Sequence, residues 1–520
     1  MSPNHVDRLL SAVLLALWFA LSAVAVHVLP PVEVGAPWVG LTLTWMLGVV
    51  IGTVWMVSLR SLAVLVLYPL LARRRHEVPA YESDAGVVLL SCAADDFNPR
   101  ALRASMNQTH PRVSTVILDD SKDERVRAEI DSFAARTGAR VVRRARRTGF
   151  KAGNLNDFLL RGIDEEYVVV VDSDEVLPPD FVRRALDHAV HRARSGVRVG
   201  VVQGRHRTLR RVSGFADEFG ALLETHVRVT QLVRSRFGFS HFMGRGALIS
   251  TECLRATRGF PEVVAEDLAF SIEATAQGFE IVYAPELVST EEFPIDYFAF
   301  KKQHGKAAEG SVEIVRQYLA PVLRSSLRPW QKADLLLEVL SAPLGAALSA
   351  LLLVFSAIAS SSGEDVLPSW AGAAIGLGGL LPLLPEALRR LSRGEVRSAA
   401  VFLLRALVLY ASVLWTTAAA VWRVVGGGGA RFTITPKTRN TSQSASFRND
   451  VVAALVLSGL SVVVCGSALP ALGFLVAAGC AVYLGARSGA WAIPGPQRAS
   501  VAAPTAHGVS SKLGGWSTWR

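Results

Sequence analysis

Residues 167–174 of this 520-residue chain have the sequence YVVVVDSD, in which an apolar run leads directly into Asp172, Ser173 and Asp174. A short valine-rich run of this kind is typical of a strand that is buried on both faces of a sheet. Similar runs occur at residues 86–91, 114–118 and 199–203, and helical patterns lie between the runs at residues 98–107, 123–137 and 179–193. Strands that alternate with helices predict a parallel α/β sheet.

Carboxylates follow three of these predicted strands. In chain order they are Asp95 and Asp96, Asp119 and Asp120, and Asp172 and Asp174. Ligands of parallel α/β sheets bind at the carboxyl ends of the strands. Because Asp is also a common turn and helix-cap residue, any single pair has an ordinary structural explanation. Three pairs at equivalent positions favour a site for a hard divalent cation such as Mg²⁺ or Mn²⁺.

The composition indicates a membrane protein. Hydrophobic residues make up 51% of the chain, charged residues make up 19%, and the mean hydropathy is +0.33. An average globular domain has about 25% charged residues. The formal net charge of +11 is expected in cytoplasmic loops, so nucleic-acid binding is not expected. The four cysteines have neither CxxC nor zinc spacing and predict no disulfide framework and no metal site.

Long apolar runs lie on both sides of a charged central segment, and a spanning helix needs about 20 apolar residues. Arg73, Arg74 and Arg75 follow the second run, whereas the link between the first two runs has no Lys or Arg, so the centre should be cytoplasmic. We expect a multi-pass protein of the plasma membrane. The predicted units are two spans in residues 1–77, a cytoplasmic domain at 78–328, two spans in 329–388, an interfacial helix and loop at 389–450, two spans in 451–486, and a basic flexible tail at 487–520.

Individual spans are expected at residues 9–29, 38–59, 335–360, 370–388, 451–468 and 472–484, with residues 62–71 as an interfacial continuation of the second. The run at residues 399–422 is also long enough to span, but it has basic flanks and contains Arg405. An arginine in mid-membrane costs about 2.5–3.5 kcal/mol, which favours an interfacial helix and about six spans. The alternative is seven spans, which would put the tail outside.

Further motifs occur in a fixed order between the predicted spans. Residues 151–156 read KAGNLN, residues 172–174 read DSD, Glu266 precedes Asp267, and residues 432–437 read FTITPK. In this combination the chain resembles the membrane-embedded family-2 glycosyltransferases, the group of cellulose, hyaluronan and chitin synthases. The resemblance covers about residues 86–437 and implies a GT-A-type nucleotide-sugar transferase domain of class α/β, inserted in an α-helical transmembrane bundle.

The resemblance also implies roles for particular residues. Asp267 would be the general base, with Glu266 beside it, although a carboxylate that opens a helix is also stabilised by the helix dipole. Asp174, with Asp172, would hold Mg²⁺ or Mn²⁺. The nucleotide-sugar donor would contact Asp95, Asp119, Asp120, Lys151, Gly153, Asn156, Asp172, Gln303 and Lys306. The acceptor would lie near Gly244, Arg245, Gly246 and Ala307, and a gating loop would include Phe432, Thr433, Thr435 and Lys437.

The chain departs from the family's pattern at several positions. Ala265 replaces the threonine before the Glu-Asp pair, and the first-strand motif is altered at Ser91, Ala93 and Ala94. Lys306 replaces an arginine, and lysine lacks the bidentate fork of a guanidinium. Ala307 replaces a tryptophan on which the acceptor sugar stacks in polymerising relatives, so the nature of the acceptor is in question.

Taken together, the motifs predict an inverting transferase that uses a nucleotide-diphosphate sugar, by family analogy a UDP-sugar, to elongate a polysaccharide and move it across the membrane. The first alternative is non-processive transfer of a sugar to a membrane lipid, so the acceptor is a glycan or a lipid. The second alternative is a scaffold that binds a nucleotide or a glycan without turnover. A transporter would need more polar residues within its spans than these runs contain.

Overall fold

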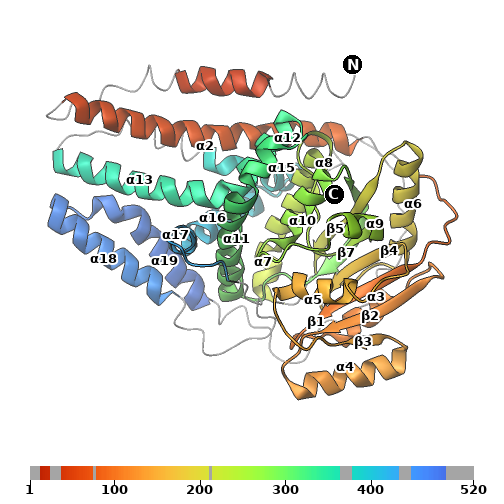
Figure 1. Cartoon of the computed structure of the whole chain (residues 1–520). Coiled ribbons are helices and arrows are strands. Elements are labelled where there is room, and N and C mark those ends of the chain that lie inside the picture. The colour runs from red at the N-terminus through yellow and green to blue at the C-terminus, as the bar shows by residue number, and fades with distance from the viewer. Residues whose placement is uncertain are drawn as a thin grey trace.

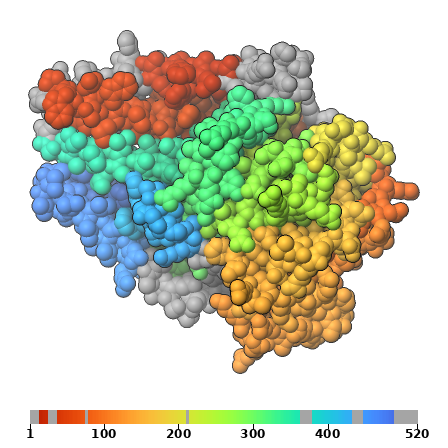
Figure 2. Space-filling view, viewed as in Figure 1, coloured from red at the N-terminus to blue at the C-terminus, as the bar shows by residue number. Residues whose placement is uncertain are grey.

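The computed structural model describes residues 12–23, 37–73, 78–209, 213–362, 378–431 and 447–487. A domain built on one β-sheet lies beside a layer of long apolar helices (Figure 1). Helix α11 (Tyr297–Arg324) runs between the two parts. In the space-filling view the part of the chain coloured orange to green lies beside α2 (Pro37–Ala72) in red and α13 (Ser341–Ser362) in teal (Figure 2).

Seven strands of the described chain form one sheet in the order β3-β2-β1-β4-β6-β5-β7. The strands are β1 (Val87–Ala93), β2 (Val113–Asp119), β3 (Arg140–Val142), β4 (Tyr167–Asp172), β5 (Val199–Thr208), β6 (Ala247–Ser250) and β7 (Glu280–Glu291). Strand β6 runs antiparallel to β4 and β5, whereas the other neighbouring pairs are parallel. The four predicted strands, β1, β2, β4 and β5, are parallel to one another. Antiparallel β6 makes the sheet mixed, and its four residues are too few to have a recognisable sequence pattern.

Helices cover both faces of the sheet. They are α3 (Pro99–Met106), α4 (Glu124–Thr137), α5 (Phe150–Leu159), α6 (Phe181–Arg194), α7 (Gly214–Thr225), α8 (Gln231–Phe237), α9 (Thr251–Ala256) and α10 (Glu266–Ala276), with a π-helix, η1 (His226–Thr230), between α7 and α8. In β1, Val88 and Leu90 pack with residues of α5 and α10, while Val87 and Leu89 pack with residues of α3, α4 and α6. Burial on both faces explains why the strands are continuous apolar runs.

The two helices that follow the first two carboxylate-bearing loops have clear capping signals. The Asn98 side chain accepts hydrogen bonds from the first turn of α3, and Asp123 caps α4 in the same way. Helix α4 ends at Gly138, whose φ of 76° is the left-handed conformation that glycine adopts without strain. These caps explain why the predicted helix bounds at 98–107 and 123–137 agree with the structure.

Five helices of the described chain are long and apolar enough to cross a membrane, by length and composition. They are Pro37–Ala72, Ser341–Ser361, Val396–Val425, Arg448–Cys465 and Leu469–Arg487. The run at residues 62–71 continues the second predicted span as one helix, α2. The run at residues 335–360 is divided between α12 (Pro329–Val339) and α13. Parts of the runs at residues 9–29 and 370–388 lie outside the described residues, so the assignment of about six spans stays a prediction.

The segment predicted to be interfacial is two helices, α16 (Val396–Ser412) and α17 (Leu414–Val425), which meet at Val413. Arg405 of α16 lies with its Nε atom 3.0 Å from Oε1 of Glu218 in α7. This ion pair compensates the arginine's charge and holds α16 against the sheet domain. The remaining C-terminal helices are α15 (Leu384–Leu391), which follows the 3₁₀ turn η2 (Leu381–Leu383), then α18 (Arg448–Cys465), and α19 (Leu472–Arg487), which follows the turn η4 (Leu469–Ala471).

Candidate active site

The carboxyl ends of β1, β2 and β4 form one rim of the sheet, as their parallel register requires. The loop at residues 243–246, which leads into β6, lies against this rim because Gly246 N donates to Val170 O at 2.9 Å. The amino ends of α5 and α10 complete the arrangement, and α11 packs beside α10. Most of the predicted site residues therefore lie in one region of the fold.

Lys151 joins three of the predicted motifs. Its Nζ atom lies 2.5 Å from Oδ1 of Asp172 and 2.9 Å from the carbonyl oxygen of Gly244. Although burial disfavours an ammonium ion, the Asp172 carboxylate raises the pKa of Lys151 above its ordinary value. The side chain therefore stays cationic and neutralises the first carboxylate of the DSD motif.

The KAGNLN motif opens α5 after a sharp turn. Gly149 has φ of 69°, and Phe150 is held at φ of 55°, which is uncommon for a residue with a side chain. A Cβ atom on Gly153 would lie 2.1 Å from the carbonyl oxygen of Thr148, so only glycine fits there. Glycine at residue 153 lets the turn close tightly against the helix.

The two asparagines of the motif bind backbone atoms. Asn154 Nδ2 donates to Leu118 O at 3.2 Å, which fixes α5 to β2. The Asn156 amide forms two hydrogen bonds of 2.8 Å with the backbone of Phe260, one as donor and one as acceptor. Asn156 thus holds the loop before α10 in place.

The aspartates after β1 and β2 are tied to nearby chain segments. Arg143 Nε lies 2.6 Å from Asp119 Oδ2, and Arg144 binds Asp120 with two nitrogens at 2.6 and 2.9 Å. Exposed Asp95 accepts hydrogen bonds from the backbone nitrogens of Lys122 and Asp123. The two arginines were missed by the sequence analysis. The only signal for them is the basic run RRARR at residues 143–147, which directly follows β3.

Glu266 and Asp267 lie in the first turn of α10, so Asp267 is at the start of a helix, as the sequence analysis expects. Asp267 faces the loop at residues 243–246, the glycine loop, since a Cβ atom on Gly244 would lie 3.4 Å from Asp267 Oδ2. Burial raises the pKa of Asp267 above its ordinary range, and burial together with the Asp267 charge raises the pKa of Glu266 to about 7. The pair therefore carries a carboxylate that titrates near neutral pH, as a general base requires.

Helix α11 carries Gln303, Lys306 and Ala307, which the family resemblance assigns to the donor and acceptor sites. Gly310 allows close packing, because its Cβ position lies 3.3 Å from the Cβ atom of Ala265, just before α10. Burial lowers the pKa of Lys306, and the nearby carboxylates of Glu266 and Asp267 act in the opposite direction. Gln303 and Ala307 are exposed on the same helix.

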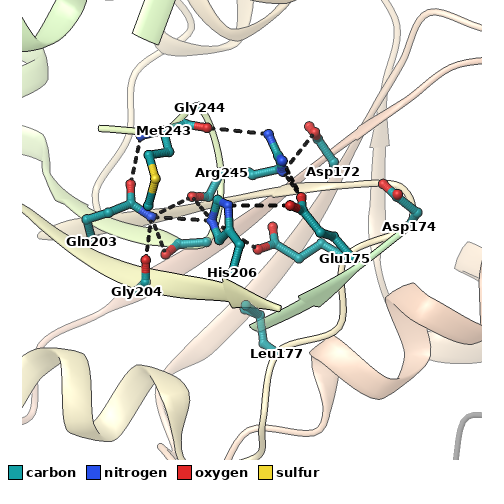
Figure 3. A network of polar contacts seen from close by, with 12 residues as sticks. Asp172, Asp174, Glu175, Leu177, Gln203, Gly204, His206, Met243, Gly244 and Arg245 are labelled. Carbon is teal, nitrogen blue, oxygen red and sulfur yellow. Dashed lines mark hydrogen bonds and ion pairs between the residues drawn. The ribbon is translucent and has the colours of Figure 1, made fainter. Parts of the chain in front are cut away.

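A buried polar network lies behind the DSD motif and the glycine loop (Figure 3). Arg245 forms an ion pair with Glu291 of β7, and its Nε atom lies 3.7 Å from Asp172 Oδ2. Gln203 holds the loop by donating to Arg245 O at 3.1 Å and accepting from Met243 N at 2.9 Å. The Arg245 side chain is thus used to fix the loop next to Asp172.

Glu175 and His206 occupy the interior of this network and were also missed by the sequence analysis. His206 Nε2 lies 3.8 Å from Glu175 Oε1, and both side chains are almost fully buried. Burial raises the pKa of Glu175 to about 8 and lowers the pKa of His206 to about 3. Burial therefore favours the uncharged form of both side chains.

The predicted donor set for a metal ion is Asp172 and Asp174. Among the described residues there is no group of three or more His, Cys, Asp or Glu side chains that could hold a metal ion. Asp174 is buried and accepts a hydrogen bond from Glu292 N at 3.2 Å. Two carboxylates fit Mg²⁺ or Mn²⁺ in the form in which substrate phosphates complete the coordination. The predicted gating loop, with Phe432, Thr433, Thr435 and Lys437, lies outside the described residues.

Comparison with known proteins identifies the central domain. The sequence profile of the family described as "Glycosyltransferase like family 2" matches residues 78–310. These residues form a family-2 glycosyltransferase domain. Over 232 residues the chain is 26% identical to glucomannan 4-beta-mannosyltransferase 2 of Arabidopsis thaliana, an alignment that covers 42% of this chain and 43% of the relative. The chain thus spans less than half the length of this curated relative.

Two solved structures are similar to part of this chain at low sequence identity. The mannosyltransferase PcManGT from Pyrobaculum calidifontis, solved with GDP-Man and Mn²⁺, has a TM-score of 0.47 and 19% identity, and the match covers 72% of this chain and 99% of PcManGT. TarS of S. aureus has a TM-score of 0.35 and 14% identity, with 57% of this chain and 52% of TarS covered. The family match confirms the expected glycosyltransferase domain and its GT-A-like α/β fold.

Proposed function

We propose that the chain is an inverting glycosyltransferase that transfers a sugar from a nucleotide diphosphate to a growing polysaccharide at the cytoplasmic face and passes the product across the membrane. The observation that carries this proposal is the link from Asp172 through Lys151 to Gly244, with Asp267 directly beside Gly244. A donor-side carboxylate motif and a candidate base thus lie on opposite sides of one short loop. The basic residues near the predicted span ends support the cytoplasmic placement of the domain.

In the proposed reaction, the oxygen of an acceptor hydroxyl forms a bond to the anomeric carbon while the bond from that carbon to the diphosphate breaks. Asp267 takes the hydroxyl proton, a role that typically contributes about 10²- to 10⁴-fold to the rate. Lys306, whose charge interacts with Asp267 and Glu266, would face the phosphates. As a point charge it would do so without bidentate geometry.

Asp172 and Asp174 would hold Mg²⁺ or Mn²⁺ together with the donor's phosphates. The ion would supply positive charge opposite the leaving diphosphate. Lys151 keeps Asp172 in place and partly neutralised, so the two neighbouring carboxylates do not repel the donor as strongly as they otherwise would.

The donor is proposed to be a UDP- or GDP-linked hexose. By analogy with the family, the proposed base is uridine. The curated relative is named as a mannosyltransferase, which adds a nucleotide-linked mannose to the candidate donors.

A second candidate function is the transfer of one sugar to a membrane lipid. Ala307 is exposed on α11, next to Lys306, and its methyl group offers no aromatic surface to a sugar ring. An acceptor held by its lipid part would not need such a surface.

The test is product formation by the purified full chain in detergent. A panel of labelled UDP- and GDP-sugars is supplied with Mg²⁺ or Mn²⁺, beside the variants Asp267→Asn and Asp174→Ala. We expect a large, glycosidase-sensitive product that requires both aspartates, with nucleotide binding retained in Asp267→Asn. Label in small, organic-soluble species would support the lipid acceptor. Nucleotide binding without turnover of any donor would contradict both functions.

A further inference from the structure

Gln203 of β5 is a buried polar side chain that the proposed reaction does not use. It is fully buried and belongs to the network of polar contacts in Figure 3. Its backbone is the last position of β5 that pairs with β6, where it lies opposite Ala247. The residues directly before Ala247 are the glycine loop, residues 243–246. Gln203 therefore lies at the point where the glycine loop joins the sheet.

The Gln203 amide binds the backbone of the glycine loop on both sides of Gly244. Its Oε1 atom accepts a hydrogen bond from Met243 N at 2.9 Å. Its Nε2 atom donates to Arg245 O at 3.1 Å and to Gly246 O at 3.2 Å. The neighbours of Gly244 are thus fixed to β5 by a single side chain.

This set of partners requires an amide at residue 203. One end of the Gln203 side chain faces an N–H group, and the other end faces carbonyl oxygens, including Gly204 O at 3.0 Å. An amide has both an acceptor oxygen and N–H donors, so it satisfies both ends. An apolar side chain would leave buried backbone groups without partners, and each such group carries the penalty of its lost hydration. The loop would then have to move to recover those hydrogen bonds.

Gly244 is the loop residue that faces the candidate base. A Cβ atom on Gly244 would lie 3.4 Å from Asp267 Oδ2. On the side of the DSD motif, Lys151 Nζ donates to Gly244 O at 2.9 Å. The Gly244 peptide therefore lies between Lys151 and Asp267. Any shift of this peptide changes the space beside Asp267 in which an acceptor hydroxyl has to fit.

The other end of the glycine loop has little room to move. A Cβ atom on Gly246 would lie 2.4 Å from Glu175 Oε1 and 2.8 Å from His206 Nε2. His206 Nε2 also lies 3.2 Å from Arg245 O. Because Gly246 is packed this closely, the movement that follows loss of the Gln203 contacts should fall mainly on the part of the loop around Gly244.

We propose that Gln203 is a positioning residue of the sugar transfer, which places the Gly244 peptide so that an acceptor hydroxyl fits beside Asp267. This inference rests on the proposed function. Gln203 acts through the backbone of the glycine loop and contacts neither substrate itself. Loss of its contacts should therefore impair use of the acceptor and leave binding of the nucleotide unchanged.

The test is the variant Gln203→Met in the purified full chain in detergent, since methionine has a similar length and no amide. Initial rates are measured against the concentration of mannotetraose, cellotetraose and, as a lipid acceptor, undecaprenyl phosphate. We expect kcat/KM for the acceptor to fall about 10- to 100-fold, because a misplacement of about 1 Å can cost about 10²-fold in rate. The affinities for UDP and GDP with Mn²⁺, measured by calorimetry, should not change.

Two further variants separate positioning from a general loss of stability. Thr208→Val removes a buried hydrogen bond of the same strand, from Thr208 Oγ1 to Gly220 O at 3.4 Å, and should leave kcat/KM for the acceptor unchanged. Gln203→Glu keeps an oxygen for Met243 N and loses the N–H groups, so it should show the same acceptor defect as Gln203→Met. It also serves as the test variant if Gln203→Met does not fold.

Hydrogen exchange of the glycine loop gives a measurement that does not depend on activity. Exchange at residues 243–246 should be faster in Gln203→Met and unchanged in Thr208→Val. Unchanged exchange, an unchanged kcat/KM for the acceptor, or an equal loss of nucleotide affinity in Gln203→Met would overturn the inference. No transfer by the unmodified chain from any sugar donor would instead contradict the proposed function, and this inference would fail with it.

Discussion

Lys151 Nζ lies 2.5 Å from Asp172 Oδ1, so the KAGNLN motif and the DSD motif are joined by an ion pair. The same ammonium group donates to Gly244 O at 2.9 Å. A single side chain thus connects β4, α5 and the loop beside Asp267. The loop at Gly244 lies 93 residues after Lys151 in the sequence, and this contact helps to hold it beside α5 and β4.

We expect Lys151→Met to raise the KM for the donor about 10- to 150-fold. A hydrogen bond to a charged group contributes about 1.5–3 kcal/mol. Its loss removes the nearer cation from Asp172 and leaves Arg245, 3.7 Å away, to offset its charge beside Asp174. The measurement is the initial rate as a function of donor and Mn²⁺ concentration. Lys302→Met, at an exposed lysine of α11, is the control and should change neither parameter. An unchanged KM in Lys151→Met would show that the ion pair has no part in donor binding.

The Glu266–Asp267 pair predicts a specific pH dependence. The pKa of Glu266 is raised to about 7, so this group is neutral below that pH and negative above it. A negative Glu266 makes Asp267 a stronger base, and kcat should therefore rise as the pH increases through about 7. Glu266→Gln is neutral throughout and should lack this step while keeping activity at lower pH.

The measurement is kcat as a function of pH, on both sides of the Glu266 pKa of about 7. Asp267→Asn should be inactive at every pH, which separates the base from its neighbour. A step near the same pH that persists in Glu266→Gln would mean that another group titrates there.

Glu175 predicts a pH-dependent stability. Its pKa is raised from 4.5 to about 8, so the folded chain keeps a proton that the unfolded chain loses. The stabilisation from this group is complete below pH 4.5 and is lost as the pH rises through about 8. Glu175→Gln imitates the protonated acid. In buffers above pH 8 it should raise the apparent Tm by roughly 2–4 °C for each kcal/mol of unfolding free energy that it restores. In acidic buffer it should leave the apparent Tm unchanged.

Scanning fluorimetry at several pH values measures this difference. Glu175→Ala is the comparison variant, because it opens a cavity and should lower the apparent Tm at every pH. The same Tm difference between Glu175→Gln and the unmodified chain at all pH values would contradict a raised pKa.

The central strands and their helices are predictable because their signals are local. Strands β1, β2 and β4 are continuous apolar runs that the chain buries on both faces, and Asp123 and Gly138 mark the ends of α4. Strands β3 and β6 have only three and four residues, so neither is long enough to show a pattern of apolar residues that would predict a strand. Their pairing is decided by the neighbouring strands and not by their own residues.

The candidate site divides in the same way. Asp172, Asp174 and Asp267 belong to contiguous motifs and can be named from the sequence. Glu175, His206 and Glu291 come together only when β4, β5 and β7 are placed in one sheet, and no spacing in the sequence predicts that contact. Arg143 and Arg144 likewise become partners of Asp119 and Asp120 only through the register of β2 and β3.

Ala307 is the residue whose replacement should distinguish the two acceptor classes. It is exposed on α11 beside Lys306, so a larger side chain fits there without disturbing the core. If the acceptor is a glycan, Ala307→Trp should add a stacking surface and lower the KM for an oligosaccharide acceptor about 2- to 12-fold, on the scale of about 0.5–1.5 kcal/mol for aromatic contacts. Longer products should accompany this change.

The control for this prediction is Lys302→Trp, which places the same side chain at an exposed position five residues earlier on α11. It should leave the acceptor KM and the product length unchanged, and both quantities are measured by gel separation of labelled products. If the acceptor is a lipid, Ala307→Trp should not lengthen the product and should instead slow transfer, because the indole ring occupies space beside Lys306. A gain in oligosaccharide affinity confined to Ala307→Trp therefore supports the polymerising function, and a loss of lipid-linked product without that gain supports single transfer.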